Sequence, residues 1–173
     1  MTTIAIVYHS GFGHTKAVAE HVAKGVQSVE GAKALLLSVD ELPPPGADRA
    51  LGGRWGELNA ADAIVFGSPT YMGDVSAEFK KFMESSSGLW FGQAWKDKVG
   101  AGFVNSGSPS GDKLQSLQTL MIFGMQHSMI WVGTGVKSGT VDGVEGVNRL
   151  GSYSGVMTQS DNAPPDQTPP QGD

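Results

Sequence analysis

The chain has 173 residues, a net charge of −5 at pH 7 and no cysteine. This length suits one domain with a substantial core, and the lack of thiols excludes disulfides, thiolate metal sites and cysteine nucleophiles. No apolar run approaches the roughly 18 residues that a membrane span needs, and none has the basic flank of a leader peptide. We therefore expect a cytoplasmic protein with no membrane partner and, given the acidic balance, no nucleic-acid partner.

Strand and helix patterns alternate along the chain. The apolar run Ile4–Val7 predicts a strand buried on both faces. Val18, Val22, Val26 and Val29 then predict one face of a helix. Further strands are expected at residues 33–39, 62–69, 98–105 and 129–134, and helices near 54–60, around 79–83 and over 114–125. Five strands alternating with helices predict an α/β fold with a parallel, doubly wound sheet.

The last part of the chain has a different composition. Residues 156–173 contain "APPDQTPP" and show no periodic apolar face, which predicts an irregular tail after a domain of residues 1–155. Met121, Met125 and Met129 are expected to fill the core.

Three polar, glycine-containing loops each follow an apolar strand: "HSGFGHT" (9–15), "SPTYMGD" (68–74) and "NSGSPSGD" (105–112). In an open parallel sheet, ligands bind at the carboxyl ends of the strands. The first loop offers hydroxyls and backbone amides at a helix N-terminus, which suits a phosphate monoester. It is neither a Walker loop nor the dinucleotide fingerprint, whose third glycine is replaced by Lys16. The alternative is an ordinary turn in which Thr15 caps the helix.

These loops carry a family resemblance. The segment 9–15, "GSPTYMG" at 67–73 and "SGLWFG" at 87–92 resemble the flavodoxin-like fold, and more closely the tryptophan-repressor-binding-protein (WrbA-type) family of NAD(P)H:quinone oxidoreductases. The similarity covers nearly the whole chain. It implies strand order 2-1-3-4-5 in a three-layer α/β/α fold, flavin mononucleotide (FMN) as cofactor, NAD(P)H as electron donor and a homo-oligomer, either a dimer or a tetramer. The family also has a closing helix, expected after Asp173.

The resemblance assigns roles to residues of this sequence. The first loop would hold the FMN phosphate, the second would line the flavin, and the third would wrap its pyrimidine edge and ribityl chain. The implied cofactor-binding residues are Ser10, Gly11, Phe12, Gly13, His14, Thr15, Pro69, Thr70, Tyr71, Met72, Gly73, Asn105, Ser106, Gly107, Gly111 and His127. The implied substrate-facing residues are Trp90, Tyr71 and His127. Tyr71 stands where the family usually has a basic residue.

Simpler interpretations exist for two of these residues. Trp90 is the kind of residue that more often packs in a core or an interface, and His127 is typical of a surface histidine at a helix C-terminus.

The sequence favours flavin chemistry over side-chain catalysis. No His/Asp/Glu cluster has metal-ligand spacing, and no G-x-S-x-G elbow is present. The predicted function is FMN-dependent transfer of two electrons from NAD(P)H to a quinone-like acceptor, because a flavin supplies such chemistry itself. One alternative is a flavodoxin-type electron carrier, although a charge of −5 is modest for long-range steering of a protein partner. Another is a regulatory protein that binds FMN without turnover.

Overall fold

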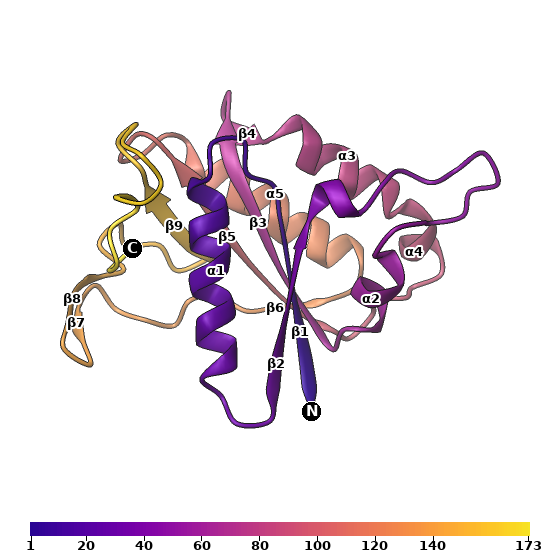
Figure 1. The fold of residues 1–173 in the computed structure, drawn as a ribbon, viewed down its shortest axis with the longest axis horizontal. Helices are drawn as coiled ribbons and strands as arrows, with labels where there is room; N and C mark the ends of the chain where they lie inside the picture. The colour runs from indigo at the N-terminus through magenta and orange to yellow at the C-terminus, as the bar shows by residue number, and fades with distance from the viewer.

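The computed structural model describes all 173 residues, with a parallel β-sheet between layers of helices (Figure 1). The strand order is β2-β1-β3-β5-β6. These strands are β1 (Thr2–Tyr8), β2 (Ala32–Ser38), β3 (Ala63–Tyr71), β5 (Val99–Ser106) and β6 (Ile130–Trp131). Since β5 and β6 are the fourth and fifth main strands, the predicted flavodoxin-like order 2-1-3-4-5 is confirmed. The short β4 (Asp74–Val75) pairs antiparallel with the end of β3.

Helices cover both faces of the sheet. On one face, Val18, Ala19 and Ala23 of α1 (His14–Gln27) pack over Ile6 and Phe103. A larger core forms on the other face. It joins the sheet to α2 (Trp55–Ala60), α3 (Ala77–Ser85) and α5 (Lys113–Gln126), with the 3-10 turn η1 (Val39–Glu41) and the short α4 (Ser87–Phe91) at its edge. No helix of the chain is long and apolar enough to cross a bilayer.

Aromatic rings organise the larger core. The Trp55 and Phe82 rings are stacked with centroids 5.2 Å apart, and Phe123 lies edge-on to Phe82 at 6.0 Å. Phe82 is 2% exposed, and truncating such a side chain to alanine costs about 3–5 kcal/mol. These contacts fix α2, α3 and α5 as one layer.

The buried face of α5 differs from the expected one. Leu117, Leu120 and Phe123 are buried, whereas Met125 is 55% exposed. Apolar residues occur all round this helix, so the sequence alone does not identify the buried side. The core role expected for Met125 is therefore wrong, while Met129 is buried as predicted.

The fifth strand is built from two separate segments. β6 pairs with Val99 and Gly100 of β5, and β9 (Val156–Gln159) pairs with Phe103–Ser106 of the same strand. Residues 132–155 intervene and include the hairpin of β7 (Gly139–Val141) and β8 (Val144–Val147). Only part of the predicted strand 129–134 therefore forms. The expected boundary between residues 155 and 156 falls directly before β9, so the predicted tail begins with a strand of the sheet.

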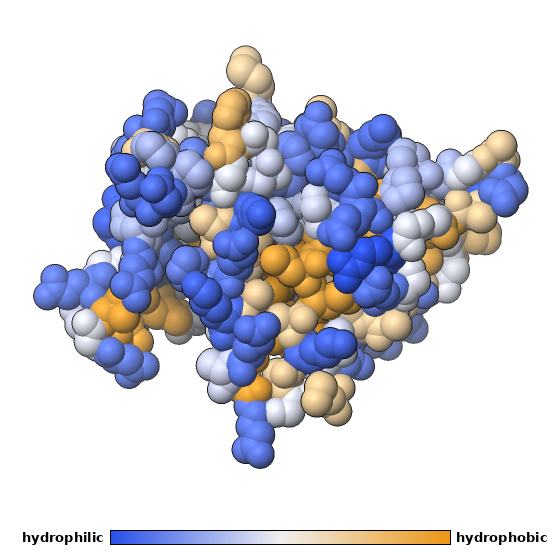
Figure 2. Space-filling model, in the orientation of Figure 1, coloured by the Kyte–Doolittle hydropathy of each residue, from blue (hydrophilic) through white to orange (hydrophobic).

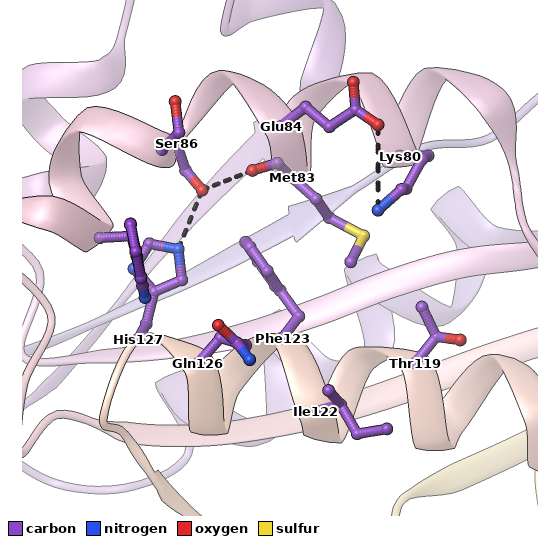
Figure 3. A pocket seen from close by; sticks show the side chains of 11 residues that line it. Lys80, Met83, Glu84, Ser86, Thr119, Ile122, Phe123, Gln126 and His127 are labelled. Atoms are coloured by element: carbon purple, nitrogen blue, oxygen red, sulfur yellow. Dashed lines mark hydrogen bonds and ion pairs between the residues drawn. The ribbon is translucent and has the colours of Figure 1, made fainter.

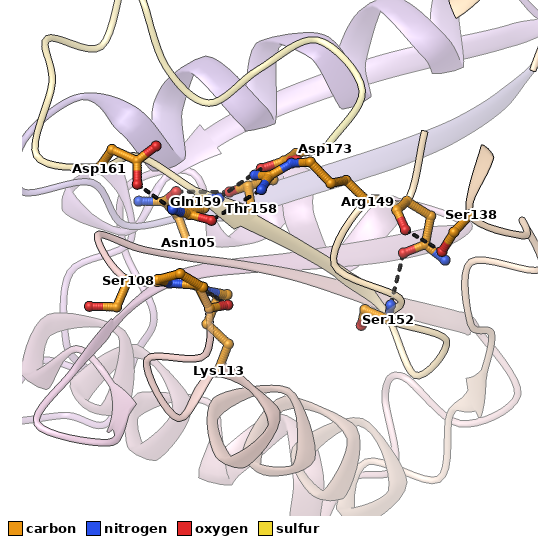
Figure 4. Close-up of polar contacts among 12 residues, drawn as sticks. Asn105, Ser108, Lys113, Ser138, Arg149, Ser152, Thr158, Gln159, Asp161 and Asp173 are labelled. Carbon is orange, nitrogen blue, oxygen red and sulfur yellow. Dashed lines mark hydrogen bonds and ion pairs between the residues drawn. The ribbon is translucent and has the colours of Figure 1, made fainter. Parts of the chain in front are cut away.

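The remaining tail, residues 160–173, has no helix or strand and folds back toward α1. His14 Nε2 donates to the Ala163 carbonyl at 2.6 Å. The Asp173 carboxylate accepts from Nε and Nη2 of Arg149, each at 2.8 Å, and from the Gln159 backbone N–H at 2.9 Å (Figure 4). Polar contacts, rather than an apolar face, hold this segment in place.

Candidate functional site

A cavity lies at the carboxyl edge of the sheet, where the three polar loops meet the end of β9. Its volume of about 400 Å³ falls in the range of small-molecule sites. The lining residues are Ser10, Gly11, Phe12, His14, Thr15, Pro69, Thr70, Tyr71, Asn105, Ser106, Gly107, Ser160 and Asn162. No Asp, Glu, Lys or Arg lines it, so polar recognition depends on hydroxyls, amides and backbone groups.

The first loop presents free backbone donors. Ser10 Oγ accepts from the N–H groups of Gly13 and Lys16, both at 3.1 Å. The N–H groups of Phe12, His14 and Thr15 donate to no protein acceptor, whereas the Gly11 N–H faces the Tyr71 hydroxyl. These donors surround the N-terminus of α1, where the helix dipole favours an anion. The loop therefore fits a phosphate group.

Thr15 belongs to the helix itself. α1 is capped by Gly13, whose φ of 93° is left-handed, and no side chain caps the helix from that position. The alternative in which Thr15 caps the helix is therefore wrong. Thr15 is 2% exposed, and its hydroxyl makes no hydrogen bond within the protein, so it is available to a ligand in the cavity.

The second loop gives the cavity an aromatic mouth. The rings of Phe12 and Tyr71 meet edge to face with centroids 6.4 Å apart, and both are exposed. Apolar side chains project at the top of Figure 2, where Figure 1 places β4 and the loop before α1. Burial, and then the negative charge of Glu78, raise the pKa of Tyr71, so its phenol stays protonated at neutral pH. Met72 and Gly73 are not in the wall; they form the β3–β4 turn with φ of 48° and 85°.

The third loop is tied to the end of β9. Asn105 Nδ2 donates to Ser160 Oγ at 3.1 Å, and its Oδ1 accepts from Thr158 Oγ1 at 2.8 Å (Figure 4). Gly111 is not part of the wall but shapes the loop, since a Cβ there would lie 2.2 Å from Ser106 Oγ.

Ser160 and Asn162 are cavity residues that sequence reasoning missed. They follow a strand end at the carboxyl edge, as the other three loops do. The polar "QSDN" at residues 159–162 is the signal that could reveal them, but the lack of a periodic apolar face predicts an irregular tail there.

His127 and Trp90 lie in a different cavity, of about 330 Å³, between α3 and α5 (Figure 3). His127 Nε2 lies 2.9 Å from Ser86 Oγ, and its ring lies 4.2 Å from the Trp95 ring. Burial lowers the pKa of His127 to about 4, so the imidazole is neutral at pH 7.

Helix direction explains why these two residues lie apart from the three loops. α5 begins at the third loop, and His127 follows its last residue, about 20 Å along the axis at 1.5 Å per residue. Trp90 likewise follows α3, which begins beside the second loop. Within one chain, neither reaches the cavity of the three loops.

Comparison with known proteins identifies the family of the chain. The family of NADPH-dependent FMN reductases matches residues 8–140. The chain therefore belongs to this family of FMN-binding, flavodoxin-like oxidoreductases, as the WrbA-type resemblance implied.

Individual relatives are similar over most of their length. Flavodoxin FldP of Pseudomonas aeruginosa is 40% identical over 100% of this chain and 89% of its own. Quinone-oxidoreductase QR2 of Triphysaria versicolor is 33% identical over 80% of this chain and 72% of its own. The crystal structure of a flavodoxin, WrbA-like protein from Agrobacterium tumefaciens shares 40% identity and a TM-score of 0.71, covering 94% of this chain and 86% of that one.

Proposed function

We propose that the protein is an FMN-dependent oxidoreductase that takes two electrons from NAD(P)H and passes them to a quinone-like acceptor. The observation that carries this proposal is the set of three free N–H groups, those of Phe12, His14 and Thr15, at the start of α1. They face a cavity that no Asp, Glu, Lys or Arg lines and that two other loops help to bound. When bound, FMN supplies the electron-transfer chemistry. The quinone acceptor is supported by the relative from Triphysaria versicolor.

The chain's own residues bind and orient in this mechanism. The free amides and the Thr15 hydroxyl would hold the phosphate, and Asn105, Thr70 and Pro69, which line the same cavity, would contact the rest of the cofactor. Phe12 and Tyr71 stand exposed at the mouth, where flat donor and acceptor rings can stack in turn. Because a flavin itself supplies the electron-transfer chemistry, the proposal assigns no side chain as acid or base.

A substrate role for Trp90 and His127 requires a second subunit, because both lie away from the cavity of their own chain. We propose a homo-oligomer, a dimer or tetramer, in which one subunit presents the exposed Trp90, and the cavity that Trp90 shares with the buried His127, to its neighbour. We also propose a cytoplasmic location, where NAD(P)H is available.

A second candidate function is favoured by one finding. The relative that matches the whole chain at 40% identity is named a flavodoxin, so an electron carrier that docks a protein reductase is the alternative. A carrier would use the same FMN cavity but would not oxidise NAD(P)H by itself.

The test is NAD(P)H oxidation by the FMN-reconstituted protein with benzoquinone as acceptor, against free FMN and apoprotein. An oxidoreductase gives saturable oxidation that depends on bound FMN. A carrier binds FMN but turns over only when a flavodoxin reductase is added, and a regulatory protein shows neither activity. Failure of the protein to bind FMN in excess cofactor would overturn all three functions.

A further inference from the structure

Lys113, the first residue of α5, is completely buried, although lysine is almost never fully buried. Its Nζ donates to Ser106 Oγ at 2.8 Å, to the Ser108 carbonyl at 2.6 Å and to the Pro109 carbonyl at 3.0 Å. Figure 4 shows the side chain rising from the helix to this loop. The three ammonium hydrogens thus meet three neutral oxygens, and no carboxylate bonds to them.

A buried ammonium without a bonded anion is costly. Burial lowers the pKa of Lys113. The negative charges of Asp173 and Asp161 stabilise the ammonium from a distance, and the positive charge of Arg149 opposes them. The nearby carboxylate of Asp173 is already engaged by Arg149. The charge is therefore only partly compensated within the protein.

Lys113 lies directly behind the wall of the cavity. Ser106 is both a lining residue and a hydrogen-bond acceptor of the ammonium, so one hydroxyl separates this charge from the ligand space. The cavity wall itself has no Asp, Glu, Lys or Arg. Because the phosphate is assigned to the first loop, the third loop faces the rest of the cofactor.

We propose that Lys113 is a positioning residue whose buried charge favours reduced FMN over oxidised FMN. The inference rests on the proposed FMN binding. Uptake of two electrons and one proton leaves the flavin ring with one additional negative charge. A cation held in a poorly solvated wall attracts that charge, and charge near the flavin ring is a means by which proteins tune its electronics.

The experiment compares affinities for oxidised and anaerobically reduced FMN in the wild type, Lys113→Met, Lys113→Arg and Lys98→Met. Lys98 is the matched control, because its Nζ also donates to two backbone carbonyls, those of Asn59 and Ala61, and burial also lowers its pKa. Lys98 lies just before β5, and Lys113 lies beyond the other end of β5. The length of this strand therefore separates the two lysines by about 25 Å.

Lys113→Met should shift the ratio of the two affinities about tenfold toward oxidised FMN, which corresponds to a midpoint potential about 30 mV lower for a two-electron couple. Lys113→Arg should restore most of the wild-type ratio, and Lys98→Met should leave it unchanged. If Lys113→Met does not fold, Lys113→Gln, which keeps N–H donors for the loop carbonyls but removes the charge, makes the same comparison.

Three results would overturn the proposal. Equal weakening of oxidised and reduced FMN would make Lys113 a tether of the loop only. If Lys113→Met weakened the binding of FMN equally in both redox states but left the binding of riboflavin unchanged, Lys113 would be a partner of the phosphate. An equal shift in Lys98→Met would show a general effect of net charge. Absence of FMN binding by the wild type would instead overturn the proposed function, and this inference with it.

Discussion

Removal of the Thr15 hydroxyl should separate binding of the phosphate from binding of the rest of the cofactor. Thr15 is 2% exposed, lines the cavity and has no hydrogen-bond partner for its hydroxyl within the protein. A hydrogen bond to a charged group contributes about 1.5–3 kcal/mol, so Thr15→Ala should raise the Kd for FMN by about tenfold to a hundredfold. Riboflavin has no phosphate, so its Kd should be nearly unchanged.

The assay is titration of apoprotein with each flavin, followed by flavin fluorescence, together with thermal unfolding of the apoprotein. Thr15→Ser is the matched control, because it keeps the hydroxyl and loses one methyl group, worth about 0.8 kcal/mol of burial. It should bind FMN nearly as the wild type does. Wild-type FMN affinity in Thr15→Ala, or an equal loss for FMN and riboflavin, would refute the assignment of this loop to the phosphate.

Three further changes test the packing of the chain. Burial lowers the pKa of His127 from 6.5 to about 4, so between these pH values the unfolded state binds more protons at this residue than the folded state does. The neutral, buried imidazole therefore costs no stability above pH 6.5, and the wild type should lose about 2 kcal/mol of unfolding free energy through His127 between pH 7 and 5. Urea titrations should show that His127→Gln lacks this component, and an equal loss in both proteins would contradict it. Gly67→Ala should destabilise by about 1–3 kcal/mol, because its Cβ would lie 2.0 Å from the Phe103 ring; Phe103→Leu should relieve that cost, and additive losses would argue against the clash. Trp95→Ala should cost about 3–5 kcal/mol and Trp90→Ala much less, since Trp95 is 0% and Trp90 45% exposed; similar melting temperatures would contradict this.

The sheet was predictable because its central strands are continuous apolar runs between polar loops. Ile6 packs into the core on one face of the sheet and Ile64 into the core on the other face, so both faces are covered and hydrophobicity alone marks these strands. β9 carries no such signal. It has four residues, and the buried Thr158 and Gln159 are polar. Thr158 is held through its hydrogen bond to Asn105, a contact between residues far apart in the sequence that no local pattern reveals.

Sequence reasoning predicted the candidate site correctly where a loop directly follows a strand. It placed residues wrongly where they follow a helix. Ser10, Thr70 and Asn105 come together because the carboxyl ends of parallel strands share one edge. A helix that starts at this edge carries the chain away from it, so His127 and Trp90 end far from the loops. The lengths of the helices were sufficient to exclude them from the cavity of their own chain.

The divided fifth strand has a consequence for how a cofactor enters and leaves. β9 holds to β5 over only Val156–Gln159, yet it carries Ser160 and Asn162 into the cavity wall. Detaching these few residues would open the cavity while β1, β3 and α1 keep their contacts. We therefore expect the rates of flavin uptake and release to follow local opening of β9 rather than global unfolding. Amide hydrogen exchange should then be faster at Thr158 than at Ile6, and bound FMN should slow it at Thr158 first.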